Sequence, residues 1–140
     1  MSHARARRAI EVKLGAWADA KPIEVAYGLE PFQPPQGQVY LRGFLIPASA
    51  TSRYLASDAI EYRGIYQISI VCPSDTPISV PEGLIDGLSD LFMVDSQLAR
   101  AGFEGIVLNP ASQGPTINEP NTYTIPLSIT YLGQAPKGAA

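Results

Sequence analysis

The residue types that most often carry chemistry are scarce in this chain. His3 is the only histidine and Cys72 the only cysteine in 140 residues. A Cys–His dyad or a Ser–His–Asp triad would need the histidine beside its nucleophile in a pocket, and His3 lies in the first turn of the chain. Cys72 ends an apolar run, where a thiol packs by default as a small hydrophobic group. The sequence therefore predicts no catalytic residue.

The sequence also lacks the residue patterns that metal and cofactor sites need. A zinc site built from several histidines or cysteines is excluded by their number. The segment Gly102-Phe103-Glu104-Gly105 matches neither of the glycine-rich phosphate-binding fingerprints. We expect no metal ligand, no cofactor-binding residue and no enzymatic activity. A small hydrolase that uses His3 or Cys72 is the remaining catalytic hypothesis.

Three carboxylates share one face of a predicted helix. Glu82, Asp86 and Asp90 recur every fourth residue, which places them about 6 Å apart at each step along the helix. An acid–base pair or a divalent-ion site needs carboxylates that converge from different elements. Two interpretations stay open: a solvated helix face, or a contact surface that meets basic groups of another chain.

The charge balance excludes some partners. The net charge is −3 and the isoelectric point about 5.0, so the chain as a whole should not attract DNA or anionic lipid. Arg5, Arg7 and Arg8 form the one basic cluster, without neighbouring aromatic residues for base stacking, and we expect no specific nucleic-acid binding. The segment from Asp75 to Glu119 contains seven acidic residues and a single basic one, Arg100. This polarity suits contacts between copies, although two solvated faces explain it too.

No segment predicts a membrane or export role. No apolar run reaches the roughly 20 residues that a membrane-spanning helix needs. The basic stretch from Ala4 to Arg8 does not fit a secretory signal, so we expect a protein of the host cytoplasm.

Hydrophobic spacing predicts two helices and five strands in the order α-β-β-β-α-β-β. The first helix runs from Ser2 to about Asp19, and the second starts with the capping box Ser79-Val80-Pro81-Glu82. The predicted strands cover residues 23–27, 39–46, 60–72, 103–108 and 122–131. Pro126 should place the last strand at a sheet edge or at a bulge.

The pattern favours one α+β domain over residues 1–140, with a disordered tail at 134–140. We predict a mostly antiparallel sheet with both helices packed on one face. If Phe44, Ile65 and Val71 point away from the helices, the second face of the sheet is partly apolar, which favours self-association.

The order and spacing of these segments resemble the bacteriophage tail terminator family of the lambda minor tail protein U type and its small prophage relatives. None of the motifs is specific alone. The resemblance rests on Tyr40-Leu41-Arg42-Gly43, on Tyr66-Gln67-Ile68-Ser69-Ile70-Val71-Cys72-Pro73, on Pro77 before an acidic helix, and on the closing Ser128-Ile129-Thr130-Tyr131.

The resemblance implies a structural phage or prophage tail protein that caps the tail tube, ends its polymerisation and provides the head–tail joining surface. Its implied partners are further copies of itself in a six-membered ring, the major tail tube protein and a head-completion or connector protein. The isolated subunit could be monomeric, and the implied location is the virion tail. The alternative is a non-enzymatic adaptor or tail-assembly chaperone that binds one protein partner through a sheet edge.

Overall fold

The computed structural model describes residues 2–28, 30, 32–52, 59–94, 97–100 and 103–136. Its two helices are α1 (Ser2–Ala20) and α2 (Ser79–Leu91). The strands are β1 (Val25–Tyr27), β2 (Tyr40–Ser52), β3 (Ala59–Pro73), β4 (Gln97–Arg100), β5 (Phe103–Val107), β6 (Ser112–Gln113), β7 (Ile117–Asn118) and β8 (Thr122–Pro136). The predicted order of helices and main strands is confirmed, and β4, β6 and β7 are additional.

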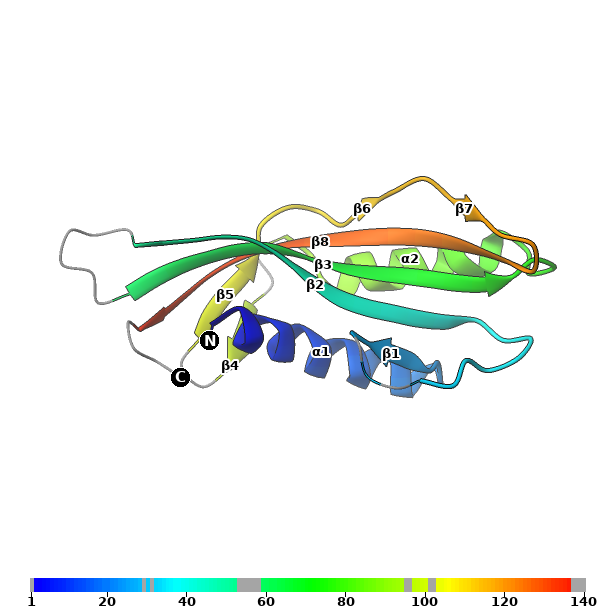
Figure 1. The fold of residues 1–140 in the computed structure, drawn as a ribbon, viewed down its shortest axis with the longest axis horizontal. Coiled ribbons are helices and arrows are strands. Elements are labelled where there is room, and N and C mark those ends of the chain that lie inside the picture. Colours follow the sequence, from blue (N-terminus) through cyan, green and yellow to red (C-terminus); the bar gives the residue numbers. More distant parts are fainter. Residues whose placement is uncertain are drawn as a thin grey trace.

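The strands form one mixed sheet that is antiparallel except for its first pair. Among the described residues the sheet has 8 strands, in the order β1-β2-β3-β8-β5-β4, with β6 and β7 pairing with β8. Only β1 runs parallel to its neighbour β2. The long β2–β3 hairpin and β8 extend along the whole molecule, as Figure 1 shows. The sequence-based prediction of a mostly antiparallel α+β fold is thus correct.

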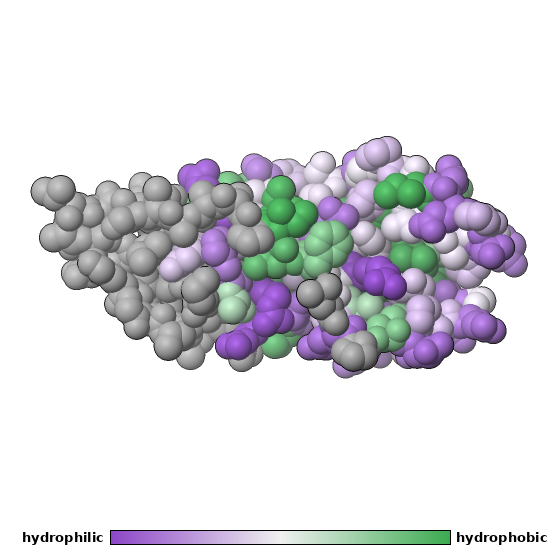
Figure 2. Space-filling model, in the orientation of Figure 1, coloured by the Kyte–Doolittle hydropathy of each residue, from purple (hydrophilic) through white to green (hydrophobic). Residues whose placement is uncertain are grey.

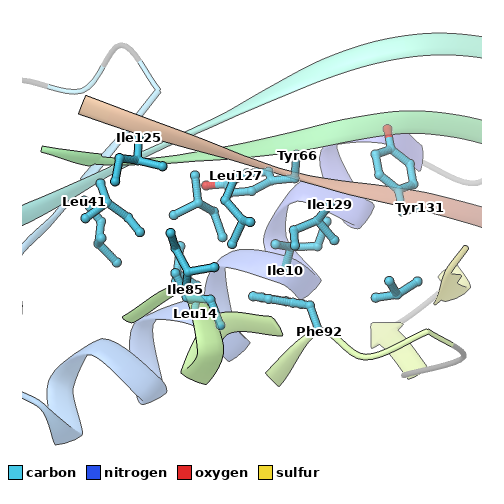
Figure 3. Packing of buried hydrophobic residues seen from close by; sticks show 14 of the residues in the cluster. Ile10, Leu14, Leu41, Tyr66, Ile85, Phe92, Ile125, Leu127, Ile129 and Tyr131 are labelled. Carbon is cyan, nitrogen blue, oxygen red and sulfur yellow. The ribbon is translucent and has the colours of Figure 1, made fainter. Parts of the chain in front are cut away.

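Alternation along the long strands builds the core. Tyr66, Ile68 and Ile70 of β3 are fully buried, and so are Leu127 and Ile129 of β8, which lie opposite them. Residues of both helices join the same cluster: Ala6, Ala9, Ile10 and Leu14 of α1 with Ile85, Leu88 and Phe92 at α2. Figure 3 shows part of this cluster, with Ile10, Ile85 and Leu127 among the labelled side chains between the helices and the strands. Burial at every second strand position follows from the two-residue period of a strand.

Two tyrosines of this core lie against glycines. A Cβ atom at Gly43 would approach the Tyr66 ring, with 2.9 Å to Cζ. A Cβ atom at Gly64 would be 2.7 Å from Cζ of Tyr131, its direct cross-strand partner. The absence of a side chain at these positions lets each large ring lie flat on the neighbouring strand.

Pro126 lies inside the sheet, so the expectation of an edge strand is wrong. β8 pairs with β3 on one side and with β5, β6 and β7 on the other. The carbonyl of Pro126 accepts a hydrogen bond from Gly114 N at 2.8 Å, so its nitrogen faces the same side. Gly114 lies between β6 and β7, where the ladder is broken, and the missing N–H of proline falls at that break.

Two further expectations differ from the structure at the ends of elements. The residue before α2 is Ile78, and no side chain caps the helix, because helical geometry already begins at Ile78. The predicted capping box at Ser79 is therefore absent. Strand β8 reaches Pro136, so residues 134–136 of the expected tail belong to the sheet, while 137–140 lie outside the described residues.

Candidate interaction surface

The structure places His3 among aromatic side chains. Its Nδ1 lies 2.6 Å from the hydroxyl of Tyr131, and its ring meets that of Tyr62 edge-on at a centroid distance of 4.8 Å. Burial lowers the pKa of His3, which favours the neutral imidazole. Burial also raises the pKa of Tyr131 to about 12, which keeps its hydroxyl protonated. The pair therefore acts as a packed hydrogen bond near the start of α1.

Cys72 lies far from His3. Tyr62, which touches His3, is ten residues before Cys72 on the same strand β3, a separation of about 33 Å. The thiol is fully buried, and this burial raises its pKa, so the reactive thiolate is disfavoured. The two residues that the sequence offered for nucleophilic catalysis do not come together.

Carboxylates and other metal-binding groups do not converge in the part of the chain that the structure describes. No group of three or more His, Cys, Asp or Glu side chains able to hold a metal ion occurs there. Glu82, Asp86 and Asp90 are all exposed along α2, as the helical spacing predicted. No described side chain forms an ion pair with any of the three acids. Among the described helices, none is long and apolar enough to cross a membrane.

The arginine cluster is only partly available to partners. Nη1 of Arg7 lies 2.8 Å from Oε1 of Glu11, one helical turn away, and the other carboxylate oxygen accepts a 2.8 Å hydrogen bond from the hydroxyl of Tyr66. Arg8 is exposed, and the side chain of Arg5 lies outside the described residues. No sequence pattern indicates this network, because Tyr66 is 55 residues from Glu11 along the chain.

A partly apolar surface covers the side of β2 and β3 opposite the core. We define the outer sheet face as Tyr40, Arg42, Phe44 and Ile46 of β2 with Arg63, Ile65, Gln67, Ser69 and Val71 of β3, which alternate with the core positions. Phe44 is 37% exposed and Ile46 is 41% exposed, and Ile46 lies directly opposite Ile65. Figure 2 shows apolar side chains gathered near the middle of the molecule. Phe44, Ile65 and Val71 all occupy outward positions of their strands, as expected, although Val71 is only 7% exposed.

A hollow of about 400 Å³ lies at the end of this face that holds Tyr40 and Val71. The guanidinium of Arg42 stacks over the Tyr40 ring at 5.7 Å from its centroid, beside the hollow that both residues line. The other lining residues come from three strands and the turn after β7: Ser69, Val71, Ile117, Glu119, Thr122 and Thr124. Such a mixture of a cation, an aromatic ring and apolar side chains suits contact with another protein.

Comparisons with known proteins place the chain in a family. A family model described as "Phage tail terminator protein" matches residues 5–131. No curated protein matches the sequence. One similar solved structure, whose name is only a sequence identifier, has 31% sequence identity and a TM-score of 0.77, and the match covers 100% of this chain and 99% of that one. Since the family model spans most of the chain, the protein belongs to the phage tail terminator family.

Proposed function

We propose that this protein caps the phage tail tube, ends tube polymerisation and provides the surface to which the head side of the particle joins. The observation that carries the proposal is the match of the tail terminator family model to residues 5–131. The exposed outer sheet face supports it, because a capping protein must present contact area to its partners.

In this proposal the subunit works as a rigid component without catalysis. Both helices cover one face of the sheet, and the other face is left to partner proteins. Six copies close into a ring, which contacts the major tail tube protein on one side and a head-completion or connector protein on the other. The subunit is made in the cytoplasm of the host bacterium and becomes part of the virion tail.

Tube length is the direct test of this function. Purified tube protein should form shorter tubes when this protein is added during polymerisation, and particles assembled without it should carry tubes of uncontrolled length. Electron micrographs give both distributions. Unchanged lengths in both experiments would refute the capping role.

The location of the protein separates capping from the alternative role of a tail-assembly chaperone. A capping protein stays in the finished particle, so labelled antibody should mark the head-proximal end of purified tails. A chaperone leaves before maturation, and its absence from purified virions would favour that role instead.

A further inference from the structure

The outer sheet face combines exposed apolar groups with positive charge. Phe44 and Ile46 follow Arg42 along β2 at alternate positions, and Arg42 is exposed and forms no ion pair with a described side chain. None of the nine residues that define this face is acidic, and Glu119 lines the hollow that adjoins Arg42. Exposed apolar side chains of this size cost free energy in water, which favours their burial against apolar groups of a partner. The positive charge of Arg42 favours acidic groups beside those apolar groups.

Helix α2 presents the complementary combination on the other side of the molecule. Its acids Glu82, Asp86 and Asp90 are exposed, and no described side chain pairs with them. Exposed apolar residues bracket the acidic stripe: Ile78 just before the helix is 54% exposed, and Met93 just after it is 56% exposed. Like charges one turn apart repel each other mildly, and this repulsion is relieved when basic groups approach.

The two surfaces also agree in length. A helix of the 13 residues of α2 is about 20 Å long. The seven residues of β2 from Tyr40 to Ile46 span about 23 Å. The hollow of about 400 Å³ beside Arg42 is large enough to take side chains from an approaching helix.

We propose that the outer sheet face binds helix α2 of a second copy of this chain. In this contact the acids of α2 lie beside Arg42. The exposed apolar residues at the ends of the helix, Ile78 and Met93, cover Phe44 and Ile46. The inference rests on the proposed assembly of identical copies and names the two surfaces that join them. Arg7 fits this role less well, because it is already paired with Glu11 inside its own subunit.

A contact between two different surfaces makes the association directional. α2 packs its buried residues Ile85 and Leu88 into the core, whereas the outer sheet face lies on the side of β2 and β3 away from that core. A pair of bound copies therefore still offers one free surface of each kind, one on each copy. Such heterologous contacts form closed rings when the rotation between copies closes, and open filaments when it does not.

Charge exchange between two variants tests the proposal. Arg42→Glu gives a copy with an acidic helix and an acidic sheet face, and Glu82→Lys/Asp86→Lys gives a copy with both surfaces basic. Each variant alone should associate at least about tenfold more weakly than the parent chain in sedimentation experiments, because like charges then meet. An equimolar mixture should regain assembly, since each acidic helix can meet a basic sheet face and each basic helix an acidic one.

Matched controls separate this interface from general charge effects. Arg8→Glu reverses an exposed charge on α1, and Val12→Glu replaces an apolar residue that is 59% exposed on the same helix. Both variants should leave association unchanged, because neither residue belongs to the two proposed surfaces. Circular dichroism checks that each variant is folded. Association of the parent chain should also weaken as salt is raised, because screening at about 0.15 M acts within about 8 Å.

Three results would overturn the proposal. The first is a parent chain that stays monomeric at about 1 mM in low salt. The second is a mixture that fails to regain assembly although both variants are folded. The third is association that is weakened by Arg8→Glu but not by Arg42→Glu. Failure of the capping role is a separate result: tube lengths would then be unaffected while the charge-exchange pattern of association persists.

Discussion

Removing one hydroxyl from the core should have a measurable cost. Tyr66 is fully buried in β3, and its Oη donates to Oε2 of Glu11 on α1 at 2.8 Å. The Glu11 side chain is only 14% exposed, so water cannot readily replace the lost donor. In Tyr66→Phe the carboxylate keeps Arg7 as its partner and loses its hydrogen bond from the sheet. Burial and the hydrogen bond to Glu11 both raise the pKa of Tyr66, so the hydroxyl is protonated at neutral pH.

We expect Tyr66→Phe to lower the free energy of unfolding by about 2 kcal/mol, the range typical of hydrogen bonds to charged groups. For a chain of this size that corresponds to a fall in Tm of about 6 °C. Urea unfolding followed by the fluorescence of Trp17, the one tryptophan, measures the change. Combining the substitution with Glu11→Gln in a double-mutant cycle isolates the interaction between the two side chains.

Tyr40→Phe is the matched control for this experiment. Tyr40 lies on the outer sheet face, and no described group forms a hydrogen bond with its hydroxyl, so its removal should change stability by less than about 0.5 kcal/mol. A Tyr66→Phe variant as stable as this control would refute the assignment of Glu11 and Tyr66 as the link between α1 and β3.

Three further predictions concern the glycines of α2, His3 and Tyr131. Gly83→Ala should stabilise the protein by about 0.5–1 kcal/mol, because nothing lies within 4 Å of the added Cβ. Gly87→Ala should destabilise it, since its Cβ would lie 2.9 Å from Cζ2 of Trp17. Thermal unfolding that shifts in the same direction for both variants would contradict this pair of predictions. Burial lowers the pKa of His3, so the unfolded chain takes up this proton first and stability should decrease as the pH falls below 6.5; unfolding curves of His3→Gln should lose that decrease. Burial raises the pKa of Tyr131 from 10.0 to about 12, so stability should fall as the pH rises through that interval, and Tyr131→Phe should show a smaller fall.

The long elements could be predicted because their spacing is imposed by burial on one side. Tyr66, Ile68 and Ile70 alternate with Gln67 and Ser69, and the structure buries the first set in the core. The same two-residue period identified β8, and the spacing of Ile10 and Leu14 identified α1. The short strands β6 and β7 left no such pattern, because their two-residue segments are exposed and are held by backbone hydrogen bonds to β8.

The candidate surface was only half visible in the sequence. Phe44 and the stripe of acids on α2 were singled out from their spacing. Arg42 drew attention only as part of the segment Tyr40-Leu41-Arg42-Gly43. Arg42 stacks over Tyr40 within β2, but the hollow beside them also needs residues from β7 to β8, among them Glu119 and Thr122. No local pattern marks a hollow that is formed by segments so far apart in sequence.

By itself the sequence determined the residue inventory and its periodicity: one histidine, one cysteine, two amphipathic helices and strands with one apolar face. These features follow from residue type and from the repeat of each element, which are local properties. The tertiary structure decided which groups meet, including Glu11 with Tyr66 and His3 with Tyr131. It also decided that Arg7 is paired within the subunit while the acids of α2 face outward, because hydrogen bonds and ion pairs depend on distances that only the folded chain sets.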